Sequence, residues 1–291
     1  MRKGKRKLLV YSLLILFAMA FTWHSCTKQE EVTTNNTKEL RDNFRKNENV
    51  LSERNIVSLL KESGLSVTNE LEELDLRNTG SADCGTNQDP GVTCFDYGVD
   101  GFISVPPDGN TPGCDQTYVS FTIDVCIDNV TGQLVSFSFS DFNAYPVESG
   151  LGCGDLWQYW FRMDSEDAYK SIDAFIYRAS LIVEEMMAGV LVGTDIACPN
   201  TYATSNFSRD LCYRICYTPI NEPPFIHPEQ IRCGEGCCKR TTEWCRNDDG
   251  ELESSGPVFE KVGECEPWVP QPCTGWLSPT CEHECGPITE N

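Results

Sequence analysis

The sequence predicts an α+β protein in which disulfide bonds hold an antiparallel sheet, one long amphipathic helix packs on the sheet, and a cysteine-dense β-meander follows on the C-terminal side. Three observations predict this fold. Residues 117–125 and 134–140 alternate between apolar and polar, residues 165–193 have apolar side chains at helical spacing, and all 17 cysteines except Cys26 lie between Cys84 and Cys285. An antiparallel sheet with one apolar face needs a cover, which the helix supplies.

The N-terminus has the order of an export signal. Residues 2–7 contain five basic side chains, and residues 8–23 are uncharged and largely apolar before the chain reaches Cys26. The apolar run has 16 residues, which is short of the roughly 20 that a helix needs to cross a bilayer. We expect residues 1–25 to be a signal peptide.

The residues around Cys26 resemble the lipobox of bacterial lipoproteins, in which a small residue such as Ser25 precedes the cysteine that becomes the acylated N-terminus. Trp23 and His24 depart from the strict pattern, although looser boxes are found in Bacteroidota. Residues 27–31 resemble the acidic tag that exports such lipoproteins to the outer face of the outer membrane. The resemblance covers about the first 31 residues and implies palmitate-type lipidation of Cys26. The alternatives are a secreted protein and an uncleaved anchor helix.

Residues 26–80 are expected to form a lipid-anchored polar tether without a core. After Cys26 this segment has no cysteine, and Phe44 is its one aromatic residue. Ser52 is positioned to cap a short helix that ends at Gly64. The alternative is an amphipathic arm that docks on a partner.

Residues 81–200 are predicted to form an antiparallel hairpin and the long helix. Residues 117–125 and 134–140 alternate with period two and are joined by the turn-forming residues 128–132. Asp164 or Ser165 is expected to start the helix and Gly193 to end it, which gives a length of about 40 Å. The aromatic cluster at 157–161 is expected to be core, with a carbohydrate-stacking platform as the alternative.

Residues 201–291 are predicted to form a cysteine-rich β-meander and a bridged cap that contains Pro and Trp. In this part, residues 233–245 resemble modules of uncharacterised exported proteins of Bacteroidota, and the resemblance implies no activity. Adjacent Cys237 and Cys238 are expected to bond to different partners. Of the 16 cysteines after Cys26, six precede residue 200 and ten follow it, so the two parts could be separately bridged or share one core. The disulfide candidates are Cys84, Cys94, Cys114, Cys126, Cys153, Cys198, Cys212, Cys216, Cys233, Cys237, Cys238, Cys245, Cys265, Cys273, Cys281 and Cys285.

Candidate catalytic and metal-binding residues are few. After the signal, histidine occurs only at His227 and His283, both expected at the surface, and no nucleophile, phosphate-loop or dinucleotide motif is found. Residues 281–285, Cys-Glu-His-Glu-Cys, offer a zinc alternative with two sulfur ligands. A calcium alternative rests on loop aspartates, namely Asp83, Asp89, Asp96, Asp100, Asp108 and Asp115.

Charge and composition limit the classes of function that we expect for this protein. The chain has 23 basic and 44 acidic residues, a net charge of −21, and without the five basic residues of the signal the balance is 18 minus 44, or −26. Such a body repels nucleic acid and anionic lipid head groups. We expect a non-catalytic ectodomain that binds or supports an extracellular protein or glycan, without a cofactor. The alternatives are a glycan or peptide hydrolase that uses paired carboxylates or calcium, and a disulfide-rich inhibitor or adhesin-like module.

Overall fold

In the computed structural model, residues 50–291 form one compact unit. The residues that the structure describes all lie in this unit: 51, 53–68, 91–109, 111–147, 152–163, 165–219, 226–265, 276–278, 281 and 283–288. The predicted signal peptide, Cys26, Asp83, Cys84, Asp89 and Cys273 lie outside these residues.

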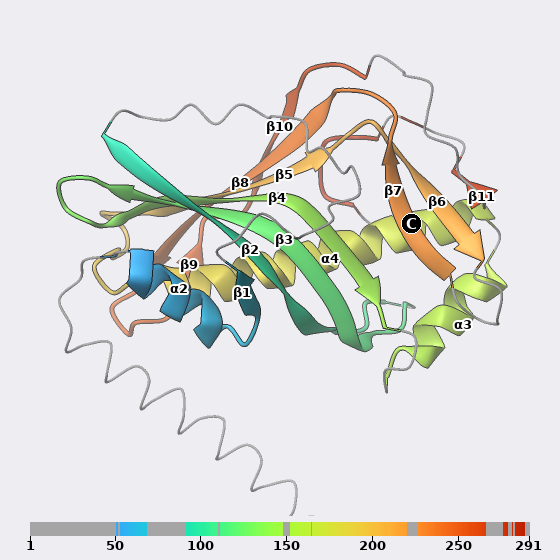
Figure 1. Ribbon diagram of the computed structural model, residues 1–291, viewed down its shortest axis with the longest axis horizontal. Coiled ribbons are helices and arrows are strands. Elements are labelled where there is room, and N and C mark those ends of the chain that lie inside the picture. The colour runs from blue at the N-terminus through green and yellow to red at the C-terminus, as the bar shows by residue number, and fades with distance from the viewer. Residues whose placement is uncertain are drawn as a thin grey trace, which may run out of the picture. The chain divides into compact units, whose positions relative to one another are not determined.

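An eight-stranded sheet forms the centre of this unit (Figure 1). Its strands are ordered β1-β2-β3-β4-β5-β8-β10, and β9 pairs with β8. All of these pairs are antiparallel except β4 with β5. The strand bounds are β1 Ser66–Thr68, β2 Val92–Val105, β3 Cys114–Asp128, β4 Leu134–Pro146, β5 Ala203–Asp210, β8 Cys237–Arg246, β9 Leu252–Ser254 and β10 Val258–Val262.

The predicted hairpin is β3 and β4, and the sequence alternation sets its two faces. Val119, Phe121, Ile123 and Val125 are buried, whereas Tyr118, which follows the opposite parity, is only partly buried. On β4, Phe137 and Phe139 are buried opposite Val125 and Ile123. The turn is fixed because the Asp128 carboxylate accepts hydrogen bonds from the backbone N–H groups of residues 130 and 131 at 2.9 and 2.7 Å.

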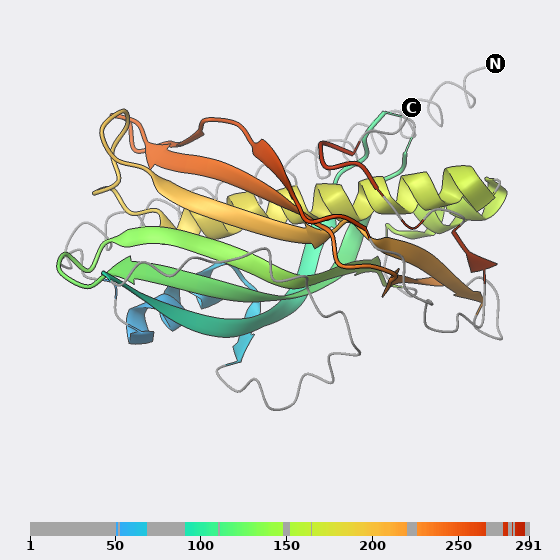
Figure 2. The same cartoon turned by 90° about the horizontal axis from the view of Figure 1, so that it is seen from above.

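Helix α3, Gly154–Arg162, and helix α4, Ser165–Leu191, connect β4 to the parallel strand β5. Figures 1 and 2 show α4 running along one side of the sheet, where it contacts β2, β4 and β5. Arg246 on β8 donates to the carbonyl oxygens of Gly189 and Val192, each at 2.7 Å, and thereby satisfies acceptors that the end of a helix leaves unpaired. The long helix therefore lies where the sequence predicted, but it is one of three helices in the described residues.

The prediction of a core-free tether at 26–80 differs from the structure at residues 53–68. Helix α2, Glu53–Glu62, places Ile56 and Leu60 at 0% exposure in the same hydrophobic core as the hairpin, and β1 then adds to the edge of β2. The helix was expected from Ser52 and Gly64, but its burial was missed because its few apolar residues stand in a polar segment. They all fall on one side of the helix, which packs beside α4 and β1.

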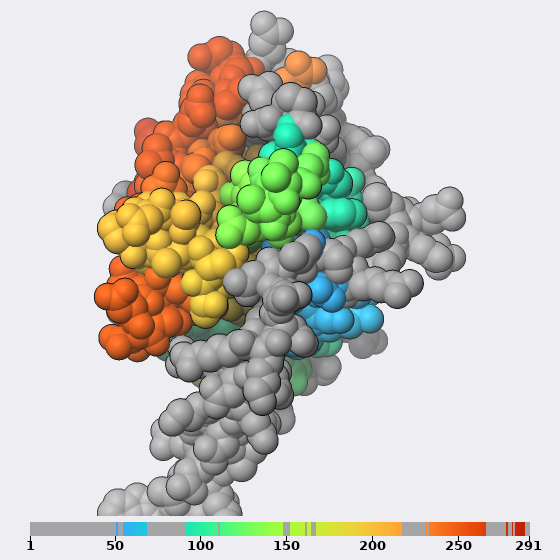
Figure 3. Space-filling model, turned by 90° about the vertical axis from the view of Figure 1, so that its left-hand side faces the viewer, coloured from blue at the N-terminus to red at the C-terminus, as the bar shows by residue number. Residues whose placement is uncertain are grey.

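Within the described residues after 200, the strands do not form a separate meander. Strands β8, β9 and β10 extend the main sheet, while β6 Tyr213–Pro219, β7 Ile226–Arg232 and β11 Trp276–Leu277 make a second sheet in the order β11-β6-β7. Figure 3 views the end of the main sheet where the β3–β4 turn, the segment before β5 and the β8–β9 turn lie side by side. At this end, Ala197 forms an isolated parallel β-bridge with Arg246. Arg246 Nη1 also donates a hydrogen bond to the carbonyl oxygen of Gly250 at 3.0 Å.

Disulfide bonds hold both sheets, and this prediction is confirmed. All fourteen cysteines in the described residues are disulfide-bonded. Cys238 pairs with Cys285, so it does not bond to adjacent Cys237. Cys198–Cys245 joins the two cysteine groups, so the arrangement of two separately bridged halves is absent here. The other described bridges are Cys94–Cys126, Cys114–Cys153, Cys212–Cys265 and Cys233–Cys281.

Candidate functional site

Three aromatic side chains form a row on the side of the sheet away from α4. Phe102 on β2 lies opposite Tyr118 on β3, and Tyr118 lies opposite Tyr145 on β4. Their ring centroids are 5.6 and 5.1 Å apart, with interplanar angles of 68° and 38°. Phe102 is 60% exposed, and the two tyrosines are half-buried. We call these three residues the aromatic row and this side of β2–β4 the outer face.

Carboxylate, hydroxyl and amide groups surround the aromatic row. Asp100 precedes Phe102 by two residues, and Ser120 and Asn143 occupy the same level on β3 and β4. Burial, followed by the negative charge of Asp100, raises the pKa of the phenols of Tyr118 and Tyr145. Residues 91–147 contain no Lys, Arg or His. The outer face therefore combines apolar rings with negative charge.

A pair of carboxyl groups lies further along the outer face, where Asp96 on β2 is opposite Asp124 on β3. Burial, followed by the hydrogen bond and charge of Asp96, raises the pKa of Asp124 to about 7. Ser138 on β4 donates to Asp124 Oδ2 at 3.1 Å, which acts in the opposite direction, and the charge of Asp141 adds to the increase. One proton shared by the pair removes the repulsion between two adjacent negative charges.

The variant Asp124→Asn is expected to change how stability depends on pH. The folded-state pKa of Asp124 lies above the value of about 3.9 in an unfolded chain, so the wild type loses stability as pH rises from about 4 to about 7.5. The amide that replaces the carboxyl group cannot ionise. As pH rises across that window, we therefore expect the free energy of unfolding of the variant to increase by roughly 1 to 2 kcal/mol relative to that of the wild type. This figure includes a reduction because Asp124 is partly exposed to solvent.

This difference is measured by chemical denaturation of both proteins at several pH values, without reductant. Glu185→Gln, at an exposed position of α4, is the matched control, and we expect it to change stability by no more than about 0.5 kcal/mol. A pH-independent difference for Asp124→Asn would show that the carboxyl pair does not share a proton.

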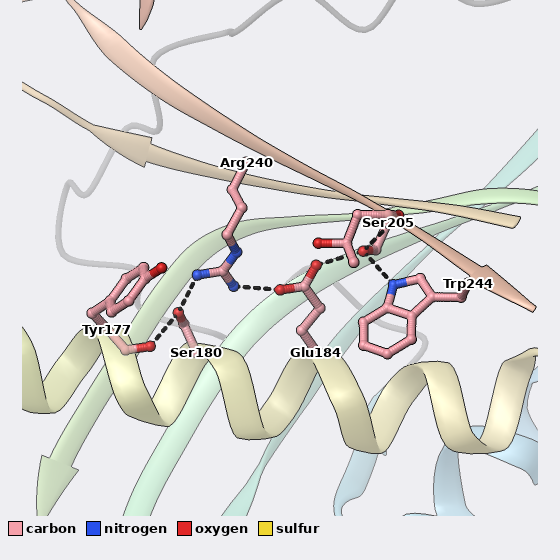
Figure 4. Close-up of polar contacts among 7 residues, drawn as sticks. Tyr177, Ser180, Glu184, Ser205, Arg240 and Trp244 are labelled. Atoms are coloured by element: carbon pink, nitrogen blue, oxygen red, sulfur yellow. Dashed lines mark hydrogen bonds and ion pairs between the residues drawn. The ribbon is translucent and has the colours of Figure 1, made fainter. Parts of the chain in front are cut away.

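A second polar cluster is buried between α4 and the sheet (Figure 4). Arg240 Nη2 on β8 and Glu184 Oε2 on α4 form an ion pair at 2.5 Å, and each side chain is 3% exposed. Ser205 donates to the other Glu184 oxygen at 2.5 Å, and Trp244 Nε1 donates to Ser205 at 2.7 Å. Arg240 also donates to Ser180 at 3.1 Å. Because this cluster is closed to solvent, it fixes α4 on the sheet and offers no surface to a ligand.

A third cluster attaches the C-terminal segment to the body. The imidazole of His283 stacks on Tyr213 with ring centroids 3.9 Å apart, and its Nε2 lies 2.9 Å from the carbonyl oxygen of Tyr213. The Tyr213 hydroxyl donates to Asp173, whose Oδ2 lies 4.0 Å from His283 Nδ1. His283 was expected at the surface, and its side chain is 20% exposed, so it lies there only in part, with its ring packed on the buried Tyr213. The side chain of His227 lies outside the described residues.

The metal-binding alternatives gain no support from these positions. Cys281 and Cys285 are both in disulfides, so neither sulfur is available to zinc. Among the described residues, no three His, Cys, Asp or Glu side chains are grouped so that they could hold a metal ion. Of the aspartates considered for calcium, Asp96 and Asp100 lie on the outer face. Asp115 accepts a hydrogen bond from Ser104 at 3.3 Å, and Asp108 forms an isolated bridge with Thr111.

Sequence reasoning missed the aromatic row as a unit. The aromatic cluster at 157–161 was expected to be core, and this is confirmed for Trp157 and Trp160, which are 5% and 1% exposed. The members of the row are 43 positions apart at most, from 102 to 145, and only the strand register brings them together. The sequence did offer one indication of the row. Tyr118 falls among the alternate positions of its strand that were expected to face solvent.

No protein-family model, curated protein or solved structure matches this chain. Within the described residues, no helix is long and apolar enough to cross a membrane. The account of function below therefore rests on the sequence and the geometry of the described residues.

Proposed function

We propose that this protein is a lipoprotein, anchored through Cys26 at the outer surface of the outer membrane, whose disulfide-bonded body binds an extracellular partner without catalysing a reaction. The signal-like N-terminus and the resemblance at Cys26 support the anchor. The described disulfides support an oxidising location. In this proposal, the outer face of β2–β4 is the surface that the body offers to its partner.

The aromatic row carries the proposal of binding. Phe102 is 60% exposed and contacts the ring of Tyr118 on the neighbouring strand, and Tyr118 in turn contacts Tyr145 on the next strand. Single apolar residues are common on protein surfaces, whereas a contiguous aromatic patch is typical of an interaction site. Tyr also supplies a large rigid contact area and a hydroxyl that can hydrogen-bond at an interface.

Asp96 and Asp124 are the carboxyl pair that a glycan or peptide hydrolase could use. Their arrangement does not favour hydrolysis. The two groups are hydrogen-bonded, whereas glycoside hydrolases hold their two carboxyl groups about 5 to 9.5 Å apart. Turnover of a polysaccharide or peptide that Asp124→Asn abolishes would nevertheless establish this alternative.

Site-specific crosslinking in intact cells tests the proposed function. The full-length chain would carry photoreactive benzoylphenylalanine at position 102 or, as the control, at position 258. Val258 is 67% exposed and lies on β10, which is several strands away from β2–β4 in the sheet. We expect a discrete crosslinked species from position 102 that is absent from position 258. Equal yields at the two positions, or no adduct at either, would contradict a binding surface on the outer face.

A further inference from the structure

We propose that the outer face binds a cationic segment of a polypeptide, with a Lys or Arg side chain of the partner held against Phe102, Tyr118, Tyr145 and Asp100. This inference rests on the proposed function and specifies the chemistry of the partner. The aromatic row supplies the apolar surface, and Asp100 supplies the charge that recognises an ammonium or guanidinium group.

The orientation of the rings favours a cation over a sugar. A pyranose ring stacks on an open, flat aromatic face, whereas the rings of Phe102 and Tyr118 meet at 68° and those of Tyr118 and Tyr145 at 38°. Rings at these angles do not present one flat stacking surface. A cation needs no such surface, because the face of each single ring carries negative potential that attracts it.

The position of Asp100 adds to this attraction. Asp100 lies two residues before Phe102 on the same face of β2 and opposite Ser120, which is two residues from Tyr118 on β3. The carboxylate therefore borders the row, and its negative charge also raises the pKa of both phenols. A carboxylate next to aromatic faces provides an ion pair and a cation–π contact to the same ligand group.

The charge of the surrounding segment selects against other ligands. Residues 91–147 carry seven aspartates and no basic residue, so no cation of this segment can occupy the row. Phosphate, acidic glycans and anionic lipids would be repelled. The longer-range charge of the body attracts a basic partner and speeds its association at low salt.

The chain itself uses the same contact elsewhere. In the buried cluster, Arg240 lies over the rings of Phe207 and Tyr177, with centroid distances of 4.6 and 5.2 Å. There the aromatic faces and the Glu184 carboxylate together hold a guanidinium group. The outer face offers rings and a carboxylate without a cation from its own segment.

Calorimetric titration of the full-length protein in detergent tests the proposal, with a short oligolysine peptide as the probe. We expect salt-sensitive binding that Phe102→Ala weakens roughly 3- to 10-fold, which corresponds to one cation–π contact. Asp100→Asn should weaken it by a similar factor. Because Phe102 is exposed, its replacement leaves the fold intact, and circular dichroism would verify this.

The control separates the site from general attraction to an acidic protein. The variant Glu185→Gln/Glu260→Gln removes two exposed charges on α4 and β10, and we expect it to change the affinity by less than about twofold, as is typical of surface charges. If this variant weakens binding as much as Asp100→Asn, while Phe102→Ala has no effect, the attraction is non-specific and the proposal is wrong.

The remaining outcomes distinguish this inference from the proposed function. Binding of a neutral cello-oligosaccharide that Phe102→Ala abolishes would overturn the cationic partner and leave the outer face as a binding surface. Absence of oligolysine binding together with a specific crosslink from position 102 would also overturn the cationic partner and leave the outer face as a binding surface. Absence of both oligolysine binding and the crosslink would overturn both proposals.

Discussion

Replacing Glu184 by alanine is expected to lower the free energy of unfolding by about 3 to 5 kcal/mol, the cost of leaving a buried charge without its partner. Arg240 would remain 3% exposed between α4 and β8 with Ser180 as its remaining hydrogen-bond acceptor in the cluster. Ser205 would also lose its acceptor on Glu184. Chemical denaturation under non-reducing conditions measures the change.

The neighbouring residue provides the control for this effect. Glu185 is exposed on the same helix, and Glu185→Ala should change stability by no more than about 0.5 kcal/mol. The double variant Glu184→Leu/Arg240→Met should recover most of the loss, because apolar residues of similar size replace buried ion pairs with little cost. Equal stability of Glu184→Ala and Glu185→Ala would show that the ion pair does not hold α4 on the sheet.

Replacing Cys26 by serine is expected to abolish attachment to the membrane almost completely. Serine cannot form the thioether that carries the lipid, and the acyl chains supply about 0.8 kcal/mol for each buried methylene. The remaining acidic body has no attraction for an anionic surface. In cell fractionation, we therefore expect the variant in the soluble fraction and the wild type in the membrane fraction.

The control for this experiment is the stability of the body, which Cys26→Ser should leave unchanged. The described disulfides lie far along the chain from position 26, so oxidised protein of both kinds should show the same denaturation curve. Membrane attachment that survives Cys26→Ser would contradict the lipid anchor and favour an uncleaved anchor helix.

The spacing of apolar residues along the chain predicted the hairpin and the long helix, because neighbouring residues determine both elements. The β3–β4 hairpin follows from alternation and the turn at Asp128, and α4 follows from apolar residues at helical spacing. In the same way, the burial of Trp157 and Trp160 follows from their place beside that helix. In each case neighbouring residues in the chain set the structure.

Contacts between distant segments could not be predicted. The parallel pairing of β4 with β5 depends on a crossover through two helices, and Cys198–Cys245 joins cysteines that parity assigned to different groups. The burial of α2 depends on which surface its few apolar residues meet. The aromatic row needs the register of three strands, which sequence alternation alone leaves open.

The measurement that tests the account most directly is the intact mass of the protein extracted from membranes, before and after reduction. The account predicts a chain that begins at an acylated Cys26 and lacks two hydrogens for each bridge among the remaining 16 cysteines, 17 minus Cys26, with no thiol open to alkylation. A chain that begins elsewhere without lipid, or that carries several free thiols, would contradict an exported, lipid-anchored and disulfide-bonded protein.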